Sequence, residues 1–323
     1  MNLNDMVRGG LQRRALLTAM GGVLGAVLVG CGGSEAEGAR PVVVVTTGHI
    51  HDAAAAIVEG TDVELQLLCG PGVDPHSYSA STRDVLAMDR AQAILFNGFH
   101  LEAQLGEILD GGKFEAKSWS MAGAFPADRR LDWVEDGEVD PNAPFDPHIW
   151  NDLEGWSVCV EALAAHLGTV FPDQAEAFAK NGAAYVAEVR AADAWATEQL
   201  SSLPKERRLL VSGHDAFSYF ARGYDMETIA VLGVGNDPEA DLRTMRSVAE
   251  AVSERKVPTI FLESITNPKL TEALQEACEA RGWKVEIAET PLYSDDLGDK
   301  APVDTFLGAF RSNVETIVAA LQV

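Results

Sequence analysis

The sequence predicts an α/β protein made of two similar halves joined by one long helix. Short β-branched and apolar runs alternate with helical patterns in both halves, and one extended helical pattern, Pro172–Leu203, separates the two series. The apolar runs are nearly continuous, which indicates parallel strands covered on both faces. With 323 residues, 47% hydrophobic and 23% charged, the chain is long enough for two domains and has a globular composition.

The first half of the chain has a strand–helix–strand rhythm. A β-branched segment opens it, and helical patterns separate the apolar runs that follow. The expected strands are Val42–Thr47, Val63–Leu68, Ala93–Phe96 and Phe114–Ser118, and the expected helices are Asp52–Glu59, Ser81–Ala91 and Leu101–Leu109.

The same rhythm restarts in the second half, which ends in an amphipathic segment. Phe306, Phe310 and Val314 recur there at helical spacing, so Asp304–Gln322 should pack as a closing helix. The expected strands are Leu209–Ser212, Glu227–Leu232, Thr259–Glu263 and Lys284–Ala288, and the expected helices between them include Asp241–Ser253 and Pro268–Arg281.

The segment between the halves is expected to be one rigid helix. Pro172 suits the first turn of a helix, and Pro204 ends the pattern. A helix of this length would extend about 45 Å at 1.5 Å per residue, long enough to run across both halves. We therefore expect a stiff connection instead of the flexible crossings of a hinge-bending protein.

The first thirty residues are typical of an export signal. Basic residues precede an apolar run, Ala15–Val29, that is too short to span a bilayer. The segment Leu28–Cys31 resembles the lipobox of bacterial lipoproteins, in which the cysteine is acylated and becomes the new N-terminus. We expect residues 1–30 to be removed, Cys31 to carry the lipid, and residues 31–41 to tether an exported protein to the outer face of the cytoplasmic membrane or within the periplasm.

Charge and cysteine content exclude several classes of protein. The chain has 25 Lys and Arg against 49 Asp and Glu, a formal net charge of −24, and lacks a basic run, so nucleic acid is not an expected partner. Apart from Cys31, only Cys69, Cys159 and Cys278 remain, at wide spacings. This pattern favours small buried thiols over a disulfide framework or a CxxC metal clip, and leaves one disulfide among them open.

Histidines gather in the loops that follow expected strands. The tripeptide Asp-Pro-His occurs twice, as Asp74–His76 and Asp146–His148, and His214 adjoins Asp215 just after a strand. Ligands of open parallel sheets bind beyond the carboxyl ends of the strands, and a metal-ligating imidazole usually needs an acceptor for its second nitrogen. The candidate ligands of one metal ion are therefore His76, His148 and His214, with Asp74, Asp146 and Asp215 as candidate supporting acceptors.

A fourth, anionic ligand would complete this set. The loop after the last expected strand contains Asp295 and Asp296, and Asp295 is the better candidate by its position. Three imidazoles and one carboxylate suit Zn²⁺ more than Mg²⁺ or Ca²⁺, and Mn²⁺ fits if Asp295 binds through both oxygens. His100, in the loop Asn97–Glu102, is a further candidate for supporting the site.

Together these loops resemble one family. The segments GPGVDPHSY, DPHIW, SGHDAFSYF and LYSDDLG, with FNGFHLE, FLES and FRSNVETIVAAL, occur between Val42 and the C-terminus. They resemble the zinc and manganese substrate-binding lipoproteins of bacterial ABC importers, of the TroA and ZnuA kind. The resemblance implies two metal-binding lobes, residues 42–171 and 204–323, each a four-stranded parallel sheet with flanking helices, joined by a backbone helix at residues 172–203.

The resemblance also implies transport without catalysis. Zn²⁺ or Mn²⁺ would be the cargo, and a monomer would deliver it to a membrane permease with its ATPase. The family's four ligands fall by motif on His76, His148, His214 and Asp295. Many zinc-binding members carry a His-rich loop before the second Asp-Pro-His segment, whereas residues 125–145 of this chain contain no histidine and are acidic, which suggests a stretch that gathers cations.

Three other functions fit some of these residues. A surface-anchored zinc hydrolase would use Asp215 or Glu263 as a general base, but a fourth protein ligand closes the site to chemistry, and the chain has no HExxH motif or nucleophile elbow. A metal-stabilised adhesin would use the ion structurally in cell adhesion. A siderophore or tetrapyrrole carrier would need a large apolar cleft instead of convergent histidines.

Overall fold

The computed structural model describes residues 40–110, 112–135, 138–139, 145–235 and 242–322. The expected export signal, Cys31 and the tether as far as Ala39 lie outside these residues, as do Asp136 and Asp140 of the acidic stretch. Residues from Arg40 onward form one compact unit. Within the described part of the chain, no helix is both long enough and apolar enough to cross a membrane.

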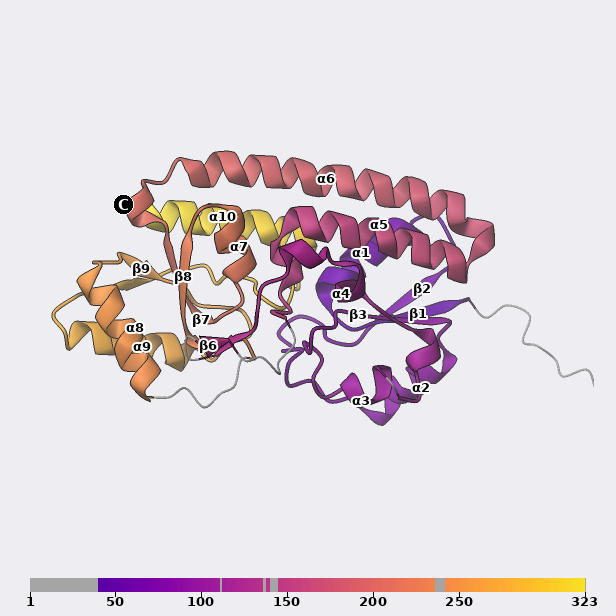
Figure 1. Ribbon diagram of the computed structural model, residues 1–323, viewed down its shortest axis with the longest axis horizontal. Coiled ribbons are helices and arrows are strands. Elements are labelled where there is room, and N and C mark those ends of the chain that lie inside the picture. Colours follow the sequence, from indigo (N-terminus) through magenta and orange to yellow (C-terminus); the bar gives the residue numbers. More distant parts are fainter. Residues whose placement is uncertain (1–39, 111, 136–137, 140–144, 236–241, 323) are drawn as a thin grey trace, which may run out of the picture. The chain divides into compact units, whose positions relative to one another are not determined.

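The first half contains a four-stranded parallel sheet in the order β2–β1–β3–β4 (Figure 1). The strand β1 (Val42–Val45) lies between β2 (Glu64–Leu67) and β3 (Ala93–Phe96), and the apolar runs predicted all three strands. Successive strand residues point to opposite faces. Val43 and Val45 accordingly pack into one core and Val44 into another, so both faces of the sheet are covered.

The fourth strand of this sheet begins later than predicted. β4 is Ser118–Ser120, whereas the sequence pattern indicated Phe114–Ser118. Phe114 is buried, but the polar segment Glu115–Lys117 forms a 3-10 turn before the strand. Pairing with β3 starts only at Ser118, opposite Ile94, because the turn contains the residues that the apolar pattern had assigned to the strand.

Helices of unequal length cover this sheet. α2 begins with a capping box in which Ser81 and Asp84 satisfy each other's backbone N–H groups. The stretch around His166 was expected to be helical, but no bounds were predicted for the 18-residue helix α5, because it is buried along much of its surface and lacks a clear polar stripe. The helices of the first half are α1 (Gly48–Val58), α2 (Thr82–Arg90), α3 (Gly106–Leu109), α4 (Met121–Ala124) and α5 (Leu153–Val170).

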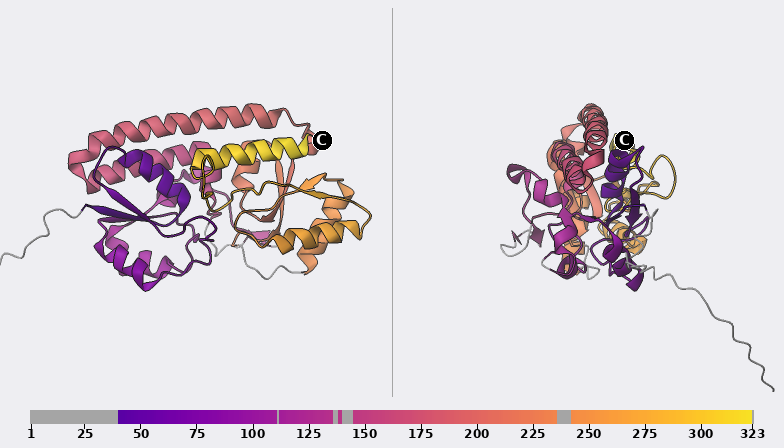
Figure 2. Two further views of the ribbon diagram at one scale, coloured as in Figure 1. Left: turned by 180° about the vertical axis from the view of Figure 1, so that it is seen from behind. Right: turned by 90° about the vertical axis from the view of Figure 1, so that its right-hand side faces the viewer.

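The predicted long helix is present as α6 (Ala175–Ser201), which has 27 residues and follows a 3-10 turn at Pro172–Gln174. It packs along α1, α5 and the closing helix α10 (Phe306–Leu321), as both sides of the molecule show (Figures 1 and 2). At Gly182 an added Cβ would lie only 2.8 Å from the Cβ of Ala164 on α5, so the two helices approach closely there. α6 therefore connects elements from both halves.

The second half contains two parallel strand pairs instead of one continuous four-stranded ladder. β7 (Leu209–His214) pairs with β8 (Glu227–Leu232), and the short strand β9 (Thr259–Ile260) pairs with β10 (Glu286–Ile287). The backbone N–H of Phe261 donates to the carbonyl of Val211 at 2.9 Å and links the two pairs. The flanking helices are α7 (Ser218–Gly223), α8 (Leu242–Glu254) and α9 (Pro268–Glu279).

A small antiparallel pair of strands lies in the acidic stretch, with β5 (Val134–Glu135) paired to β6 (Glu138–Val139).

The three cysteines of the described chain, Cys69, Cys159 and Cys278, are buried and free. They are therefore packing residues, and the alternative of one disulfide among them does not hold.

Candidate metal centre

The two Asp-Pro-His tripeptides fold in the same way. In each, the aspartate accepts the backbone N–H of the histidine two residues later: Asp74 Oδ1 from His76 at 2.8 Å, and Asp146 Oδ1 from His148 at 2.9 Å. The intervening proline fixes φ and has no N–H to compete, so each tripeptide forms a closed turn. Both imidazoles are thus positioned by residues within their own tripeptides.

The second tripeptide supports its imidazole more fully than the first. His148 Nδ1 lies 2.8 Å from Asp146 Oδ1, and both side chains are buried. This contact directs the other ring nitrogen, Nε2, toward Asp295 and His76. The carboxylate of Asp74 instead accepts the hydroxyl of Ser77 at 3.1 Å in addition to the backbone of His76.

The third histidine depends on a residue far away in the sequence. His214 ends β7, where its backbone N–H donates to Glu263 Oε1 at 2.8 Å and its Nδ1 lies 2.5 Å from Glu263 Oε2. A Cβ at Gly213 would lie 2.9 Å from Glu263 Oε1. Glycine before His214 therefore leaves room for the carboxylate that orients this imidazole.

The carboxylate of Asp295 enters from the loop after β10. A parallel bridge between Glu263 and Leu292 brings this loop beside the support of His214. Asp295 is buried, and neither of its oxygens has a hydrogen bond of normal geometry with a described residue. Buried carboxylate oxygens without such partners are costly unless a cation compensates them.

These four side chains converge on one point. Asp295 Oδ2 lies 3.2 Å from Nε2 of both His76 and His214, and Asp295 Oδ1 lies 3.5 Å from His148 Nε2. The Nε2 atoms of His76 and His148 are 3.4 Å apart, and one ligand atom from each of the four residues lies within 4.8 Å of the others. A tetrahedron with metal–ligand bonds of ~2.0–2.1 Å has edges of about 3.3 Å. The closest pairs of ligand atoms, 3.2–3.5 Å apart, are therefore near the edge length of a four-coordinate metal site.

Burial and mutual charge shift the protonation of these groups. Burial opposes ionisation of Asp295, but His214 and His148 outweigh it and hold the pKa of this carboxyl well below its usual value. Burial also opposes a charged imidazole. The charges of Glu263 and Asp295 nevertheless raise the pKa of His214 well above 6.5. The charges of Asp295 and Asp146 likewise raise the pKa of His148. For His76, burial prevails and the pKa is lowered. Without an ion, protons on the imidazoles therefore compensate the buried carboxylates.

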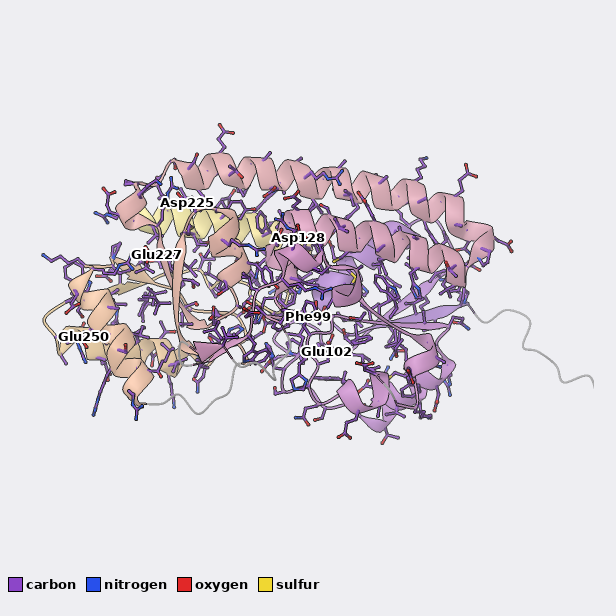
Figure 3. All side chains as sticks on the ribbon, viewed as in Figure 1. Phe99, Glu102, Asp128, Asp225, Glu227 and Glu250 are labelled. Atoms are coloured by element: carbon purple, nitrogen blue, oxygen red, sulfur yellow. The ribbon has the colours of Figure 1, made fainter. Side chains whose placement is uncertain are left out.

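The loop Asn97–Glu102 supports the site through the side chains of Glu102 and Asn97. Glu102, labelled in Figure 3, is buried and accepts the N–H groups of Asn97 at 2.7 Å and Gly98 at 3.1 Å. Asn97 Nδ2 then donates to the carbonyl of Pro147, inside the second Asp-Pro-His tripeptide, at 2.8 Å. His100, predicted as a supporting candidate, is exposed, whereas the four converging side chains are buried.

Asp215 and part of the acidic stretch lie around a cavity beside the centre. The cavity has a volume of about 420 Å³, and Asp132, Asp146, Asp215 and Arg222 contribute to its wall. Asp215 accepts the hydroxyl of Ser218 at 2.8 Å, and burial, together with the charge of Asp146, raises its pKa. Asp215 therefore lines an adjacent cavity, and a cation-gathering role for the acidic stretch stays a hypothesis.

Sequence reasoning missed the roles of three neighbouring residues. Glu263 was considered only as a general base, because its contact with His214 spans 49 residues and has no local pattern. Trp150 Nε1 donates to the carbonyl of Ser294 at 2.9 Å, and the ring of Trp150 stacks on His49 with centroids 4.5 Å apart. His49 belongs to the first turn of α1, and burial lowers its pKa to about 3. For Trp150 the available signal was an aromatic residue two positions after His148.

Comparison with known proteins identifies the family. Residues 43–320 match the model of the ZnuA family, described as the periplasmic component A of a zinc-uptake complex. The chain belongs to the ZnuA family. As a ZnuA-family protein with a buried site of three histidines and one aspartate, it is the substrate-binding component of a metal ABC importer, and it is not an enzyme. Family membership therefore supports the transport prediction over the hydrolase alternative.

Several ZnuA-family relatives resemble the chain over most of its length. The zinc-binding protein TroA of Treponema pallidum (strain Nichols) is 39% identical over 283 residues, which is 87% of this chain and 89% of TroA. Its solved structure matches with a TM-score of 0.82 over 88% of this chain and 99% of that one. The manganese-binding lipoprotein MntA of Bacillus subtilis (strain 168) is 33% identical and covers 91% of this chain and 95% of MntA. The structure of Fe(III)-bound YtgA from Chlamydia trachomatis matches with a TM-score of 0.77 at 30% identity, over 87% and 98% of the two chains.

Proposed function

We propose that this protein captures one divalent transition-metal ion and delivers it to a membrane permease coupled to an ATPase. In this proposal the ligands are Nε2 of His76, His148 and His214 and the carboxylate of Asp295. The observation that carries the proposal is their convergence: the ligand atoms are buried, 3.2–3.5 Å from one another in the closest pairs, and include carboxylate oxygens without normal hydrogen bonds.

We propose Zn²⁺ as the preferred ion. Three nitrogens and one oxygen at tetrahedral spacing suit Zn²⁺, which has no geometric preference from its d electrons and binds imidazole well. Mn²⁺ is the second candidate because both oxygens of Asp295 face imidazoles, so that a bidentate carboxylate could raise the coordination number. The relatives support keeping this second candidate, since they are named for zinc, manganese and iron(III).

We infer that the two halves act as lobes around the ion. The N-terminal lobe, residues 42–171, would supply His76 and His148, and the C-terminal lobe, residues 204–323, would supply His214 and Asp295. The linking segment, residues 172–203, is mostly the continuous helix α6, which packs against helices of both halves and so limits bending. We expect the strand pairs β7–β8 and β9–β10 to act together as the second lobe's sheet.

We also propose that the protein works as an exported monomer anchored by a lipid on Cys31. An acyl anchor would keep the protein near its permease while residues 31–41 let it move between capture and delivery. The manganese-binding relative of B. subtilis is named a lipoprotein, which supports this arrangement. Metabolic labelling with a fatty acid tests it, because Cys31→Ala should abolish incorporation of the label.

Equilibrium dialysis with elemental analysis tests the binding proposal. We expect one tightly held Zn²⁺ per wild-type chain, and a loss of affinity above about a hundredfold in His148→Ala, since losing a ligand should exceed the 10–100-fold cost typical of its supporting contacts. His100→Ala is the matched control, because it removes an exposed histidine. Wild-type protein without a stoichiometric ion, or His148→Ala with unchanged affinity, would refute the proposal.

A further inference from the structure

The loop that carries Asp295 is held from both sides by the first half of the chain. Before Asp295, the carbonyl of Ser294 accepts a hydrogen bond from Trp150 Nε1 at 2.9 Å. After it, Asp296 Oδ2 accepts the backbone N–H of Gly72 at 2.7 Å. Both donors come from segments before α6, whereas residues 294–296 come after it. These two hydrogen bonds therefore join parts of the chain that are more than 140 residues apart.

Each donor lies close to a histidine of the centre. Gly72 precedes His76 by four residues in the same loop, and Trp150 follows His148 by two residues within the 3-10 turn Ile149–Asn151 before α5. The ring of Trp150 also contacts the ring of His148 edge-on, with centroids 5.4 Å apart. Each contact therefore couples one histidine-bearing segment of the first half to the aspartate-bearing loop of the second half.

Asp296 is suited to hold this arrangement. It is buried, with 3% of its surface exposed, and its second oxygen, Oδ1, accepts the hydroxyl of Ser264. Ser264 also donates its backbone N–H to the carbonyl of Leu292 at 2.9 Å, so this anchor is fixed within the second half. A single carboxylate thus bridges an anchored hydroxyl of one half and a backbone N–H of the other.

We propose that Asp296 is a positioning residue that controls how fast the bound ion is released. This inference rests on the proposed function. Release requires Asp295 to separate from His76 and His148, and the Gly72–Asp296 hydrogen bond must break when the loop moves away from the first half. A buried hydrogen bond to a charged group is among the stronger ones in proteins. The bond therefore slows the dissociation of the ion without contacting it.

Stopped-flow release of Zn²⁺ into an excess of a chromophoric chelator tests this inference on the full chain. We expect Asp296→Ala to release Zn²⁺ about tenfold to a hundredfold faster, the range that follows from loss of one charge-assisted hydrogen bond, with an association rate near that of the wild type. Asp296→Asn should release Zn²⁺ at a rate between those of the wild type and Asp296→Ala, because its amide oxygen can accept from Gly72 and its NH₂ group can donate to Ser264, but the hydrogen bond is no longer charge-assisted.

Three further measurements separate the inference from simpler explanations. Asp52→Ala removes a partly buried carboxylate, which accepts the Tyr185 hydroxyl at 2.6 Å between α1 and α6, and should leave the release rate unchanged. Ser264→Ala, which leaves Asp296 in place but removes its anchor, should give an intermediate acceleration and serves as the test if Asp296→Ala fails to fold. Thermal unfolding establishes that each variant is folded.

The results that would overturn the inference are distinct. Release from folded Asp296→Ala within about twofold of wild type would show that the hydrogen bond does not limit dissociation. Equally fast release from Asp296→Asn would assign the effect to charge, and equally fast release from Asp52→Ala would assign it to general loosening. A wild-type protein that binds no Zn²⁺ would instead refute the proposed function itself.

Discussion

The two halves of the chain position their candidate ligands by different means. In the first half, His76 and His148 are held by aspartates two residues earlier. In the second half, His214 is held by Glu263, 49 residues later. The loop of Asp295 is held by donors from the other half. One pair of ligands is therefore supported locally, and the other depends on the tertiary structure.

This difference has a consequence for the metal-free protein. A turn closed by Asp and Pro costs little to form, because its donor and acceptor are adjacent in the chain. A contact such as His214–Glu263 forms only when β7 and the segment after β9 are already paired. We therefore expect the ligands of the first half to be preorganised even when the second half is perturbed.

The largest effect on affinity among the supporting residues is expected for Glu263→Gln. Glutamine keeps the size of the side chain but removes the charge that faces His214 Nδ1 at 2.5 Å. Loss of such a partner typically costs 10–100-fold in metal affinity. Competition titration with a chelator measures it. Asp52→Asn, which alters a carboxylate that accepts the Tyr185 hydroxyl, is the control, and an equal loss in both variants would contradict a specific role for Glu263.

A smaller effect, about tenfold, is expected for Asp146→Asn, at the lower end of the range for supporting contacts. Asparagine can still accept the backbone N–H of His148, but it no longer offers a negative charge to Nδ1 at 2.8 Å. Asp74→Asn should stay within about threefold of the wild type, since asparagine also forms this turn. The same titration measures the metal affinity of both variants. If Asp74→Asn lost as much affinity as Asp146→Asn, the two tripeptides would not differ in how they support their histidines.

The pH dependence of metal affinity should reflect protonation of His214, in the second half, more than protonation of the histidines in the first half. In the metal-free protein the pKa of His214 is well above 6.5, so this imidazole carries a proton at pH 7 and must lose it when the ion binds. Affinity should therefore rise with pH until that pKa is passed. Calorimetry in buffers of different ionisation enthalpy should detect release of about one proton or more per ion at pH 7.

The variant Glu263→Gln sharpens this prediction. Without the carboxylate, the pKa of His214 falls, so the number of protons released at pH 7 should decrease together with the affinity. Unchanged proton release in this variant, or no release in the wild type, would contradict the assignment of the proton to His214.

The smallest effect on affinity is expected for Gly155→Ala in α5, which should change stability instead. An added Cβ would lie 2.3 Å from Phe125 Cε2, and overpacking of this kind costs about 1–3 kcal/mol of unfolding free energy. Thermal unfolding should show a lower Tm, while Zn²⁺ affinity stays within about twofold because the four ligands are untouched. Gly223→Ala, where a Cβ meets no described atom within 4 Å, is the control.

The same contrast explains how far the sequence could predict the structure. The repeated Asp-Pro-His tripeptide is a local pattern, and strands followed by histidine loops predicted that His76, His148, His214 and Asp295 would meet. Their convergence in the structure agrees with that expectation. The partner of His214 could not be predicted, because nothing in the sequence around Glu263 indicates which distant N–H groups it accepts.

The fold was predictable to a similar degree. Apolar runs located β1, β2 and β3 and the long helix α6, because burial sets their patterns. The last two apolar runs of the second half extended beyond the pairing that forms: β9 and β10 are two residues long each, although five were expected for both. An apolar sequence pattern indicates that residues are buried, but it does not show that they belong to a regular strand. Phe261, for example, is buried and lies outside β9.

Anomalous diffraction from crystals of the Zn²⁺-loaded protein would locate the bound ion. We predict one strong peak at the zinc edge, about 2.0–2.1 Å from Nε2 of His76, His148 and His214 and a similar distance from a carboxylate oxygen of Asp295. A principal peak elsewhere, such as in the cavity lined by Asp132 and Asp215, or a site that lacks any of these four ligands, would contradict it.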